Sequence, residues 1–300
     1  MKVYLGIDIG GTSVKIGAVS QDGDILTSKE YSVSFDNYQT PILDTVLSFS
    51  SDFIKQFPHP YQGIGVSATG QIDTEKGEVI GTAGHIPSYI NSKIKDSLES
   101  LFNLKTTVVN DANCMLLGEQ WLGKAKRKNH VVGITLGTGV GGGILVDGNI
   151  LLGKIGIGGE LGHMSIQFEG KKCYCGSTGC YEQYASTTAL ISLVQQRLSI
   201  SDINGHWIFD NHQNPVVQQC LQEWIEAISI GIVSLTHIFN PELNLIGGGV
   251  SSQEELLIAP IRKRVLELTM PRFREVLSIE SAQLKNNAGL LGAVYYHMSH

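Results

Sequence analysis

"GIDIGGTSVKIGAVSQDGDIL" at residues 6–26 and "GITLGTGVGGGILVDGNIL" at residues 133–151 follow one pattern, and this repeat decides the fold. Each segment reads as an apolar strand, a glycine turn, a second strand and an Asp-Gly hairpin turn that leads into a third strand. Gly6 aligns with Gly133, and the agreement extends over about twenty positions. A match of this length favours duplication of one domain over chance similarity between two hairpins.

The rest of the chain alternates between strand and helix patterns, which is typical of an α/β protein. Apolar residues at helical spacing predict helices at 41–57, 96–103, 113–122, 215–239, 253–268 and 287–299. We therefore expect two similar α/β domains, residues 1–112 and residues 113–286. The helix at 287–300 is expected to pack back on the first domain.

The composition excludes several classes of protein. The 300 residues are 42% hydrophobic and 17% charged, which suits a globular chain of two domains. A formal net charge of −6 argues against a general binder of nucleic acid or membrane surfaces, and the basic run at 124–128 is typical of a solvated loop. The first residues reach glycine and aspartate too early for a signal peptide, and no run approaches the ~18 apolar residues of a membrane span. We expect a cytoplasmic protein with reduced thiols.

Three glycine turns, at residues 10–12, 137–139 and 247–249, each follow an apolar strand. Exposed backbone amides in such turns bind phosphate, and in α/β sheets ligands collect at the carboxyl ends of strands. The second turn begins a G-x-G-x-x-G run, but a strand follows it where a dinucleotide site requires a helix. The turns therefore predict phosphate binding without a Rossmann fold.

Polar residues flank the first turn. Asp8 and Thr12 bracket it, and Lys15 lies in the strand that follows. A carboxylate can hold Mg²⁺ directly or through water, and a hydroxyl or ammonium group can bind phosphate. The alternatives are that Asp8 caps the turn and that Lys15 is a solvated side chain on an alternating strand.

Asn110 and Asp111 end a short strand pattern and begin a helix. Aspartate is a common N-cap, so one interpretation is that Asp111 only starts this helix. Its place at the carboxyl end of a strand, between two phosphate-type turns, also suits a general base. Such a base accepts the proton of a hydroxyl group that receives a phosphoryl group.

Four metal-competent side chains, His163, Cys173, Cys175 and Cys180, lie in the loop 163–180 with the spacing H-x9-C-x-C-x4-C. Three thiolates and one imidazole complete a tetrahedral Zn²⁺ site with no position for water, which predicts a structural zinc. Disulfides are disfavoured in a reducing compartment, and unliganded buried cysteines are the other alternative.

Glu160 and Glu182 lie on either side of this loop. Zinc already has four better ligands, so neither carboxylate is needed as a fifth. Carboxylates held beside a metal loop can instead accept hydrogen bonds from a neutral polyol. Surface salt bridges or capping are the alternative roles for both residues.

These motifs together resemble the ROK family of sugar kinases, repressors and open reading frames, within the actin-like ATPase superfamily. They cover the chain in family order: "DIGGTSVK" (8–15), "GVSATGQID" (65–73), "VNDANC" (109–114), "LGTGVGGGI" (136–144), "GGELGHM" (158–164), "CYCGSTGCYEQYAS" (173–186), "IGGGVS" (246–251) and "AGLLGAVY" (288–295). The resemblance implies two actin-like (ribonuclease H-like) domains that close on a cleft holding ATP, Mg²⁺ and a sugar.

The resemblance also implies roles for individual residues. Asp111 corresponds to the catalytic base, and the sugar contacts correspond to Asn110, Glu160, His163 and Glu182. His163 would then bind zinc through one nitrogen and the sugar through the other, since metal on one nitrogen fixes the second. The implied phosphate- and nucleotide-binding residues are Asp8, Gly10, Gly11, Thr12, Lys15, Gly137, Thr138 and Gly139, with Gly247, Gly248 and Gly249 near the adenosine.

The expected activity is transfer of the γ-phosphoryl group of ATP to a hexose, with the 6-hydroxyl of glucose as the leading acceptor. Fructose, N-acetylmannosamine, allose and β-glucosides are alternatives, because this chain has "HIPSY" (85–89) where the family often has Asn-Leu-Pro-(Gly)-Trp. His85 and Tyr89 are therefore expected to alter the sugar pocket.

Two other functions compete with the kinase. The family's repressors carry a DNA-binding helical segment ahead of the first glycine turn, whereas here that turn begins at residue 10 of an acidic chain. An ATPase without sugar transfer is the third possibility. The expected partners are a sugar and ATP, with no nucleic acid and no membrane; the family pattern also allows a homodimer.

Overall fold

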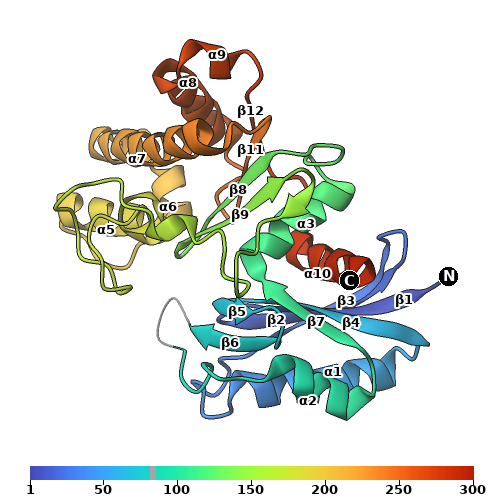
Figure 1. The fold of residues 1–300 in the computed structure, drawn as a ribbon. Helices are drawn as coiled ribbons and strands as arrows, with labels where there is room; N and C mark the ends of the chain where they lie inside the picture. Colours follow the sequence, from blue (N-terminus) through green and yellow to red (C-terminus); the bar gives the residue numbers. More distant parts are fainter. Residues whose placement is uncertain (82–85) are drawn as a thin grey trace. The chain divides into compact units, whose positions relative to one another are not determined.

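The computed structural model describes residues 1–81 and 86–300, and the chain divides into two compact units. Unit 1 comprises Met1–Lys126, Ile150–Gly159 and Asn286–His300, and unit 2 comprises Arg127–Asn149 and Glu160–Lys285. Each unit is built around a five-stranded sheet with helices packed on it (Figure 1).

The sheet of unit 1 has the strand order β3-β2-β1-β4-β7. Its strands are β1 (Val3–Ile9), β2 (Ser13–Ser20), β3 (Ile25–Ser32), β4 (Tyr61–Ala68) and β7 (Thr106–Asn110), and a second, two-stranded sheet pairs β5 (Gln71–Asp73) with β6 (Glu78–Gly81). The strands β1, β2 and β3 are antiparallel, whereas β1, β4 and β7 are parallel. The carboxyl ends of β1, β4 and β7 therefore lie at one edge of the sheet, where Asp8, Ser67 and Asn110 are found.

Helices cover both faces of this sheet. The helices α1 (Ile42–Gln56) and α2 (Ile94–Phe102) lie on one face, and α3 (Asp111–Leu122) and α10 (Ala288–Ser299) lie on the other (Figure 1). Helix α1 buries Ile42, Val46 and Phe53 at helical spacing, as expected for a helix with one face on a core. Helix α10 is apolar around most of its circumference because it contacts both α3 and the sheet.

The helices α3 and α10 approach each other closely at two glycines. A Cβ atom on Gly292 would overlap the carbonyl oxygen of Cys114, and one on Gly118 would overlap the carbonyl oxygen of Ala288. Only glycine allows two helix backbones to come this close. The C-terminal helix is therefore anchored to the helix that follows β7.

Unit 2 repeats the plan of unit 1. Its sheet has the order β10-β9-β8-β11-β12, with β10 (Asn149–Ile150), β9 (Val140–Val146), β8 (Val131–Leu136), β11 (Leu243–Gly247) and β12 (Ser278–Ser281). Two glycines face each other in the first hairpin of each sheet, Gly6 with Gly17 and Gly133 with Gly143. The matching strand order and the matching glycine pairs confirm the duplication predicted from the repeat.

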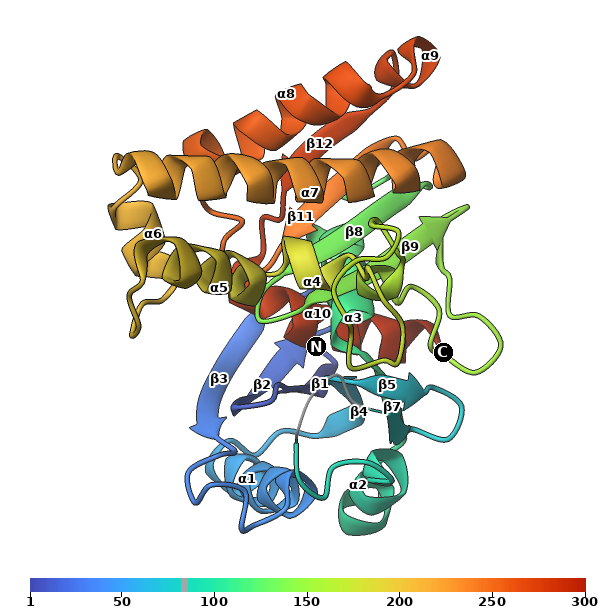
Figure 2. The same ribbon diagram turned by 90° about the vertical axis from the view of Figure 1, so that its left-hand side faces the viewer.

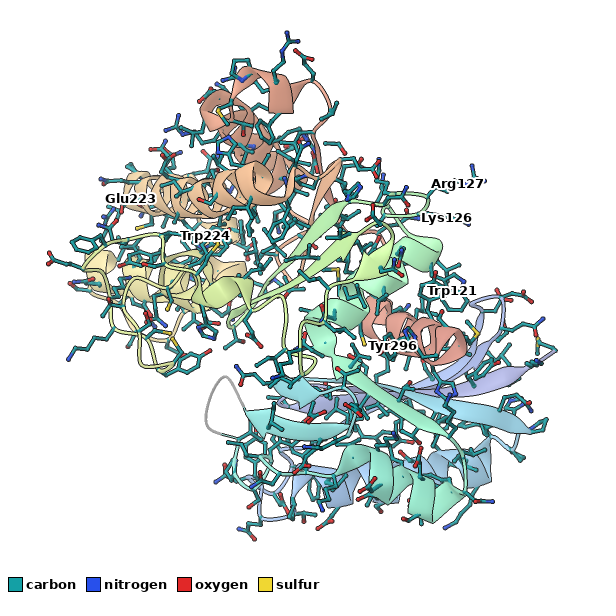
Figure 3. The ribbon with its side chains drawn as sticks, viewed as in Figure 1. Trp121, Lys126, Arg127, Glu223, Trp224 and Tyr296 are labelled. Carbon is teal, nitrogen blue, oxygen red and sulfur yellow. The ribbon has the colours of Figure 1, made fainter. Side chains whose placement is uncertain are left out.

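The helices of unit 2 surround a core centred on α7. They are α4 (Glu182–Ala185), α5 (Thr187–Leu198), α6 (Gly205–Asp210), α7 (Pro215–Phe239), α8 (Ala259–Leu268) and α9 (Pro271–Arg274), with short turns η1 (Leu161–His163) and η2 (Glu254–Ile258), while η3 (Lys285–Asn287) precedes α10. In this unit α8 lies beside α7 (Figure 2). Buried Trp224 on α7 donates from its indole nitrogen to the carbonyl oxygens of Ala185 (2.9 Å) and Ser186 (3.1 Å), which joins α7 to the start of α5 (Figure 3).

The observed elements differ from the sequence-based expectations in two respects. Helix α3 begins at Asp111 and belongs to unit 1, whereas the boundary drawn at 112/113 places it in the second domain. Its close packing on α10 is the physical reason for this difference. The helix α6 and the β5–β6 hairpin were not predicted, because short elements carry little periodicity; α5 was also not predicted, although its 12 residues make it as long as α3. None of the helices in the described parts of the chain is long and apolar enough to cross a membrane.

We expect Gly292→Ala to destabilise unit 1, because the added methyl group would force α3 and α10 apart. The cost should reach about 3 kcal/mol, the upper range for an overpacked core. Thermal and urea unfolding measure the change. Gly205→Ala in α6 is the matched control, since a Cβ there meets only Thr187, at 3.4 Å. Equal stability of the two variants would contradict the close-packing account.

His297 on α10 should make stability depend on pH. It is buried beside Thr107 Oγ1 (3.2 Å from His297 Nδ1), and burial, helped by the charge of Lys105, lowers the pKa of His297 from 6.5 to about 4. Above pH 6.5 the histidine is neutral in the folded and the unfolded chain, so its titration takes nothing from the stability of the fold. As the pH falls towards 4, only the unfolded chain takes up the proton, so stability falls by up to about 3 kcal/mol.

The variant His297→Gln removes this titration while keeping a polar group near Thr107. Urea unfolding at about pH 7 and about pH 4.5 should show a smaller loss of stability on acidification than in the unchanged protein. His206→Gln, at an exposed position on α6, is the control and should leave the pH dependence intact. An unaltered pH profile in His297→Gln would contradict the assignment.

Candidate active site and metal centre

Asp8 lies near the carboxyl end of β1 and is oriented by neighbouring elements. The hydroxyl of Ser67, its register partner on β4, donates to Asp8 Oδ1 at 2.6 Å. Burial raises the pKa of Asp8, while the Ser67 hydrogen bond and the charge of Lys15 oppose this rise. The first turn of α10 comes so close that a Cβ on Gly289 would lie 2.7 Å from Asp8 Oδ2. The positive, N-terminal end of α10 therefore lies against the carboxyl group of Asp8.

The first glycine turn is held by backbone hydrogen bonds. The amide of Gly10 donates to the carbonyl oxygen of Ser13 (2.8 Å), and the Tyr38 hydroxyl donates to that of Gly11 (2.8 Å). The side chain of Thr12 is exposed. These contacts fix the shape of the turn that we expect to bind phosphate.

Lys15 makes contacts that the sequence did not predict. It pairs with Asp8 in the β1–β2 register, and its Nζ donates to Asn286 O (2.8 Å) and to Asn287 Oδ1 (3.3 Å). Both acceptors lie just before α10. In this structure Lys15 therefore joins β2 to the start of the last helix, and its phosphate-binding role remains a prediction.

Asn110 and Asp111 lie at the junction of β7 and α3. The side-chain oxygen of Asn110 accepts from the amides of Ala112 (2.9 Å) and Asn113 (3.2 Å), so Asn110 is the N-cap in place of Asp111. Asn110 Nδ2 donates to Gly70 O (2.9 Å) and to Asp111 Oδ1 (3.0 Å). The cap thus starts the helix and also orients the carboxylate of Asp111 at its positive end.

Tyr89 lies in the core of unit 1 and is 1% exposed. Burial raises the pKa of its phenol, and the charges of Asp111 and Asp8 raise it further. Both carboxylates are therefore close to one buried aromatic ring. His85, the other residue expected to alter the sugar pocket, lies outside the described residues.

The second glycine turn contacts the start of α5. The carbonyl oxygen of Gly137 accepts from the amide of Thr187 (2.8 Å), and that of Thr138 accepts from the Thr188 hydroxyl (2.8 Å). Both bonds use carbonyl groups of the turn and neither uses its amides. The direction of the amides is therefore set by the β8–β9 hairpin itself. The turn is thus fixed in place without a helix of its own.

Glu182 anchors the other side of this turn. It is 8% exposed, and its Oε2 accepts from the amide of Val140 at 2.9 Å. A Cβ on Gly139 would overlap this carboxylate, which explains the glycine there. One buried carboxylate therefore connects the phosphate-type turn with α4, which follows the cysteine loop.

The third glycine turn follows β11, the parallel neighbour of β8. Gly247 ends the strand, and Gly248 has φ +92° and packs where a Cβ would overlap the carbonyl oxygen of Leu136. A Cβ on Gly249 would have no neighbouring atom within 4 Å. The second and third turns thus lie at the same edge of the sheet of unit 2.

The four residues expected to bind zinc form one cluster. The ligand atoms of His163, Cys173, Cys175 and Cys180 all lie within 4.8 Å of one another. Cys175 Sγ is 3.6 Å from Cys180 Sγ, and Cys173 Sγ is 3.7 Å from His163 Nδ1. A tetrahedral site with bonds of about 2.3 Å requires ligands about 3.8 Å apart, so the cluster fits Zn²⁺.

The second nitrogen of His163 faces away from the cysteines. His163 Nε2 lies 3.2 Å from the hydroxyl of Tyr174, and the two rings meet edge to face. Burial raises the pKa of nearby Glu160; His163 opposes the rise and the charge of Glu182 adds to it. Unit 2 therefore brings Glu160, His163 and Glu182 into one group, with Tyr174 beside them.

The structure thus groups the expected site residues within each unit. Unit 1 holds the first turn with Asp8, Lys15, Asn110 and Asp111, and unit 2 holds the other two turns, the metal cluster and both glutamates. Ser67 and Tyr174 were not among the residues predicted for the site. Their signals were present: Ser67 ends a strand parallel to that of Asp8, and Tyr174 stands between two metal-competent cysteines.

The chain is similar to known proteins over nearly its whole length. The model of the ROK family matches residues 4–299. The chain is 32% identical over 304 residues to a glucokinase of Thermotoga maritima (96% of this chain, 95% of that protein) and 32% identical over 297 residues to a beta-glucoside kinase of Listeria monocytogenes (97% and 96%). A crystal structure of a ROK family glucokinase from Streptomyces griseus, in complex with glucose and AMPPNP, matches with a TM-score of 0.82, 31% identity and 97% coverage of both chains.

The repeated sheet therefore has the duplicated actin-like ATPase fold. Within that class, the chain belongs to the ROK family.

We expect Cys175→Ser to release the metal, because it removes one of four ligands at an exposed position where packing is little affected. Affinity for Zn²⁺ should fall by more than about 100-fold, the upper limit for loss of an outer-shell contact. Metal analysis of the purified protein should give about one equivalent per chain before the change and much less after it.

The control is Cys220→Ser, in the core and outside the cluster, which should keep the metal. Retention of a full equivalent by Cys175→Ser would contradict the four-ligand scheme.

Proposed function

We propose that this protein is an ATP-dependent sugar kinase that transfers the γ-phosphoryl group of ATP to a hexose hydroxyl. The observation that carries this proposal is the start of α3, where the Asn110 cap fixes the Asp111 carboxylate at the carboxyl end of β7. The family and the relatives' activities support it, since the similar proteins include a glucokinase and a beta-glucoside kinase.

Asp111 is proposed to act as the general base. As the sugar oxygen forms its bond to the γ-phosphorus, the bond to the β–γ bridging oxygen breaks and ADP leaves. The proton of the attacking hydroxyl passes to the Asp111 carboxylate. Asn110 keeps that carboxylate in position, so little reorganisation is needed during transfer.

The glycine turns and Asp8 are proposed to bind the nucleotide. The turns at 10–12 and 137–139 offer backbone amides to phosphate oxygens, and the turn at 247–249 is assigned to the adenosine. The AMPPNP bound to the S. griseus relative supports ATP as the donor. Asp8 is the carboxylate that would hold Mg²⁺, directly or through water; the ion would neutralise charge on the phosphates when bound.

The sugar is proposed to bind through Asn110 and through the group of Glu160, His163 and Glu182. Charged and imidazole acceptors of this kind suit the hydroxyl groups of a hexose. Glucose, phosphorylated at its 6-hydroxyl, is the leading substrate, because the relatives include glucokinases. The alternative substrates are β-glucosides, N-acetylmannosamine, fructose and allose. They are retained because this chain has His85 and Tyr89 where the family often has Asn-Leu-Pro-(Gly)-Trp.

A coupled assay of ADP release with each of these sugars tests the activity and identifies the substrate. Sugar-dependent release is the expected result. Release without any sugar would indicate an ATPase, and specific DNA binding in a gel-shift assay without sugar-dependent release would indicate a transcriptional regulator. Either outcome would overturn the kinase proposal.

We expect Asp111→Asn to lower kcat by at least about 100-fold, because asparagine cannot accept the proton. Sugar binding, measured by calorimetry, should change little because the amide is isosteric with the carboxylate. Asp147→Asn, at an exposed turn where the carboxylate pairs with His130, is the matched control and should keep full activity. Near-normal turnover by Asp111→Asn would show that another group is the base.

A further inference from the structure

Tyr174 occupies an unusual place in the metal loop. It stands between Cys173 and Cys175, and its hydroxyl lies 3.2 Å from Nε2 of His163. The imidazole and phenol rings meet edge to face, with centroids 5.4 Å apart. The tyrosine therefore contacts the nitrogen of His163 that does not face the cysteines.

The same hydroxyl group lies in the field of two carboxylates. Burial raises the pKa of the Tyr174 phenol, and the charge and hydrogen bond of Glu182 raise it further, as does the charge of Glu160. Glu182 is already fixed by the amide of Val140, so the phenol meets a carboxylate of fixed position. The hydroxyl of Tyr174 thus contacts His163 and lies near enough to Glu182 and Glu160 for their charges to act on it.

A hydroxyl group of a sugar could make the same hydrogen bonds as the hydroxyl of Tyr174. A phenolic O–H can donate to a carboxylate and accept from, or donate to, an imidazole nitrogen, as an alcohol does. Two hydroxyl groups cannot occupy one position between Glu182 and His163 Nε2. A sugar that uses these residues must therefore displace the phenol.

The side chain has room to move. Tyr174 is 53% exposed, and the neighbouring loop residues 174–178 are exposed as well. Metal on the two flanking cysteines would fix the backbone, but it would leave the rotation of the tyrosine about its Cα–Cβ bond free. A change to another staggered rotamer carries the hydroxyl well away from His163.

We propose that Tyr174 is a displaceable occupant of the sugar site, so that its hydroxyl competes with the substrate for Glu182 and His163 and thereby sets sugar affinity. This inference rests on the proposed sugar-kinase function. It assigns to Tyr174 a role in specificity, since a sugar must offer hydroxyl groups that replace both contacts. A sugar that replaces only one of them leaves a buried polar group without its partner.

The test compares the zinc-loaded protein with its Tyr174→Phe variant, which keeps the ring and removes the hydroxyl. Binding of glucose, N-acetylmannosamine and methyl β-glucoside is measured by calorimetry without nucleotide. Loss of one competing hydrogen bond should tighten binding of the preferred sugar by about 3- to 10-fold. The value of kcat should stay within about 2-fold, because Tyr174 takes no part in the transfer step.

Tyr184→Phe is the matched control within the same region. Its hydroxyl accepts from the amide of Lys171 (2.7 Å), so this change loosens the loop without removing a contact to His163. We expect unchanged sugar affinity in this variant. An equal gain in both variants would show that loop mobility, and not competition by Tyr174, controls binding, and would overturn the inference.

An ultraviolet difference spectrum gives a second readout that a structural role would not move. Sugar binding should transfer the phenol of Tyr174 from the carboxylates to solvent, and this signal should be absent in Tyr174→Phe. Unchanged or weaker sugar binding by Tyr174→Phe would overturn the inference while leaving the kinase proposal intact. If the unchanged protein released no ADP with any of the five candidate sugars, the sugar-kinase proposal would be refuted, and the inference with it.

Discussion

The crossing of α3 and α10 at Gly118 and Gly292 is the contact on which unit 1 depends. It brings the last helix of the chain against the helix that begins at Asp111, and the same helix directs its positive end at Asp8. Both carboxylates proposed to act in phosphoryl transfer are therefore positioned by one helix pair. A side chain at either glycine would separate the backbones and displace both carboxylates together.

In unit 2 a buried carboxylate, that of Glu182, positions the parts of the proposed site. Glu182 follows Cys180 by two residues, and it also accepts from the amide of Val140 beside the second glycine turn. A metal ion on the cysteine cluster would hold the loop, and Glu182 would carry that constraint to the turn. Such a metal would have a structural part in the proposed site, since a four-ligand cluster leaves no position for water.

The sequence predicted the features that depend on neighbours close along the chain. The duplicated hairpins, the zinc-competent spacing and helix α7 (Pro215–Phe239) all follow from patterns within about 25 residues, where turn chemistry and periodicity act. The identity of the N-cap was decided by competition between adjacent residues. Asn110 and Asp111 both make good caps, and composition cannot decide between them. The place of α3 in unit 1 was missed because its partner, α10, lies far away in the sequence.

By itself the sequence determined the fold class, the family and the residue types of the proposed site. Only the tertiary structure decided which partner each polar group has: Lys15 with Asn286, Glu182 with Val140, and Tyr174 with His163. Lys15 and Asn286 are 271 residues apart, and a hydrogen bond forms only when its atoms come within a few tenths of an ångström of about 3 Å. Local propensities do not specify such distances; the packing of helices and sheets against one another does.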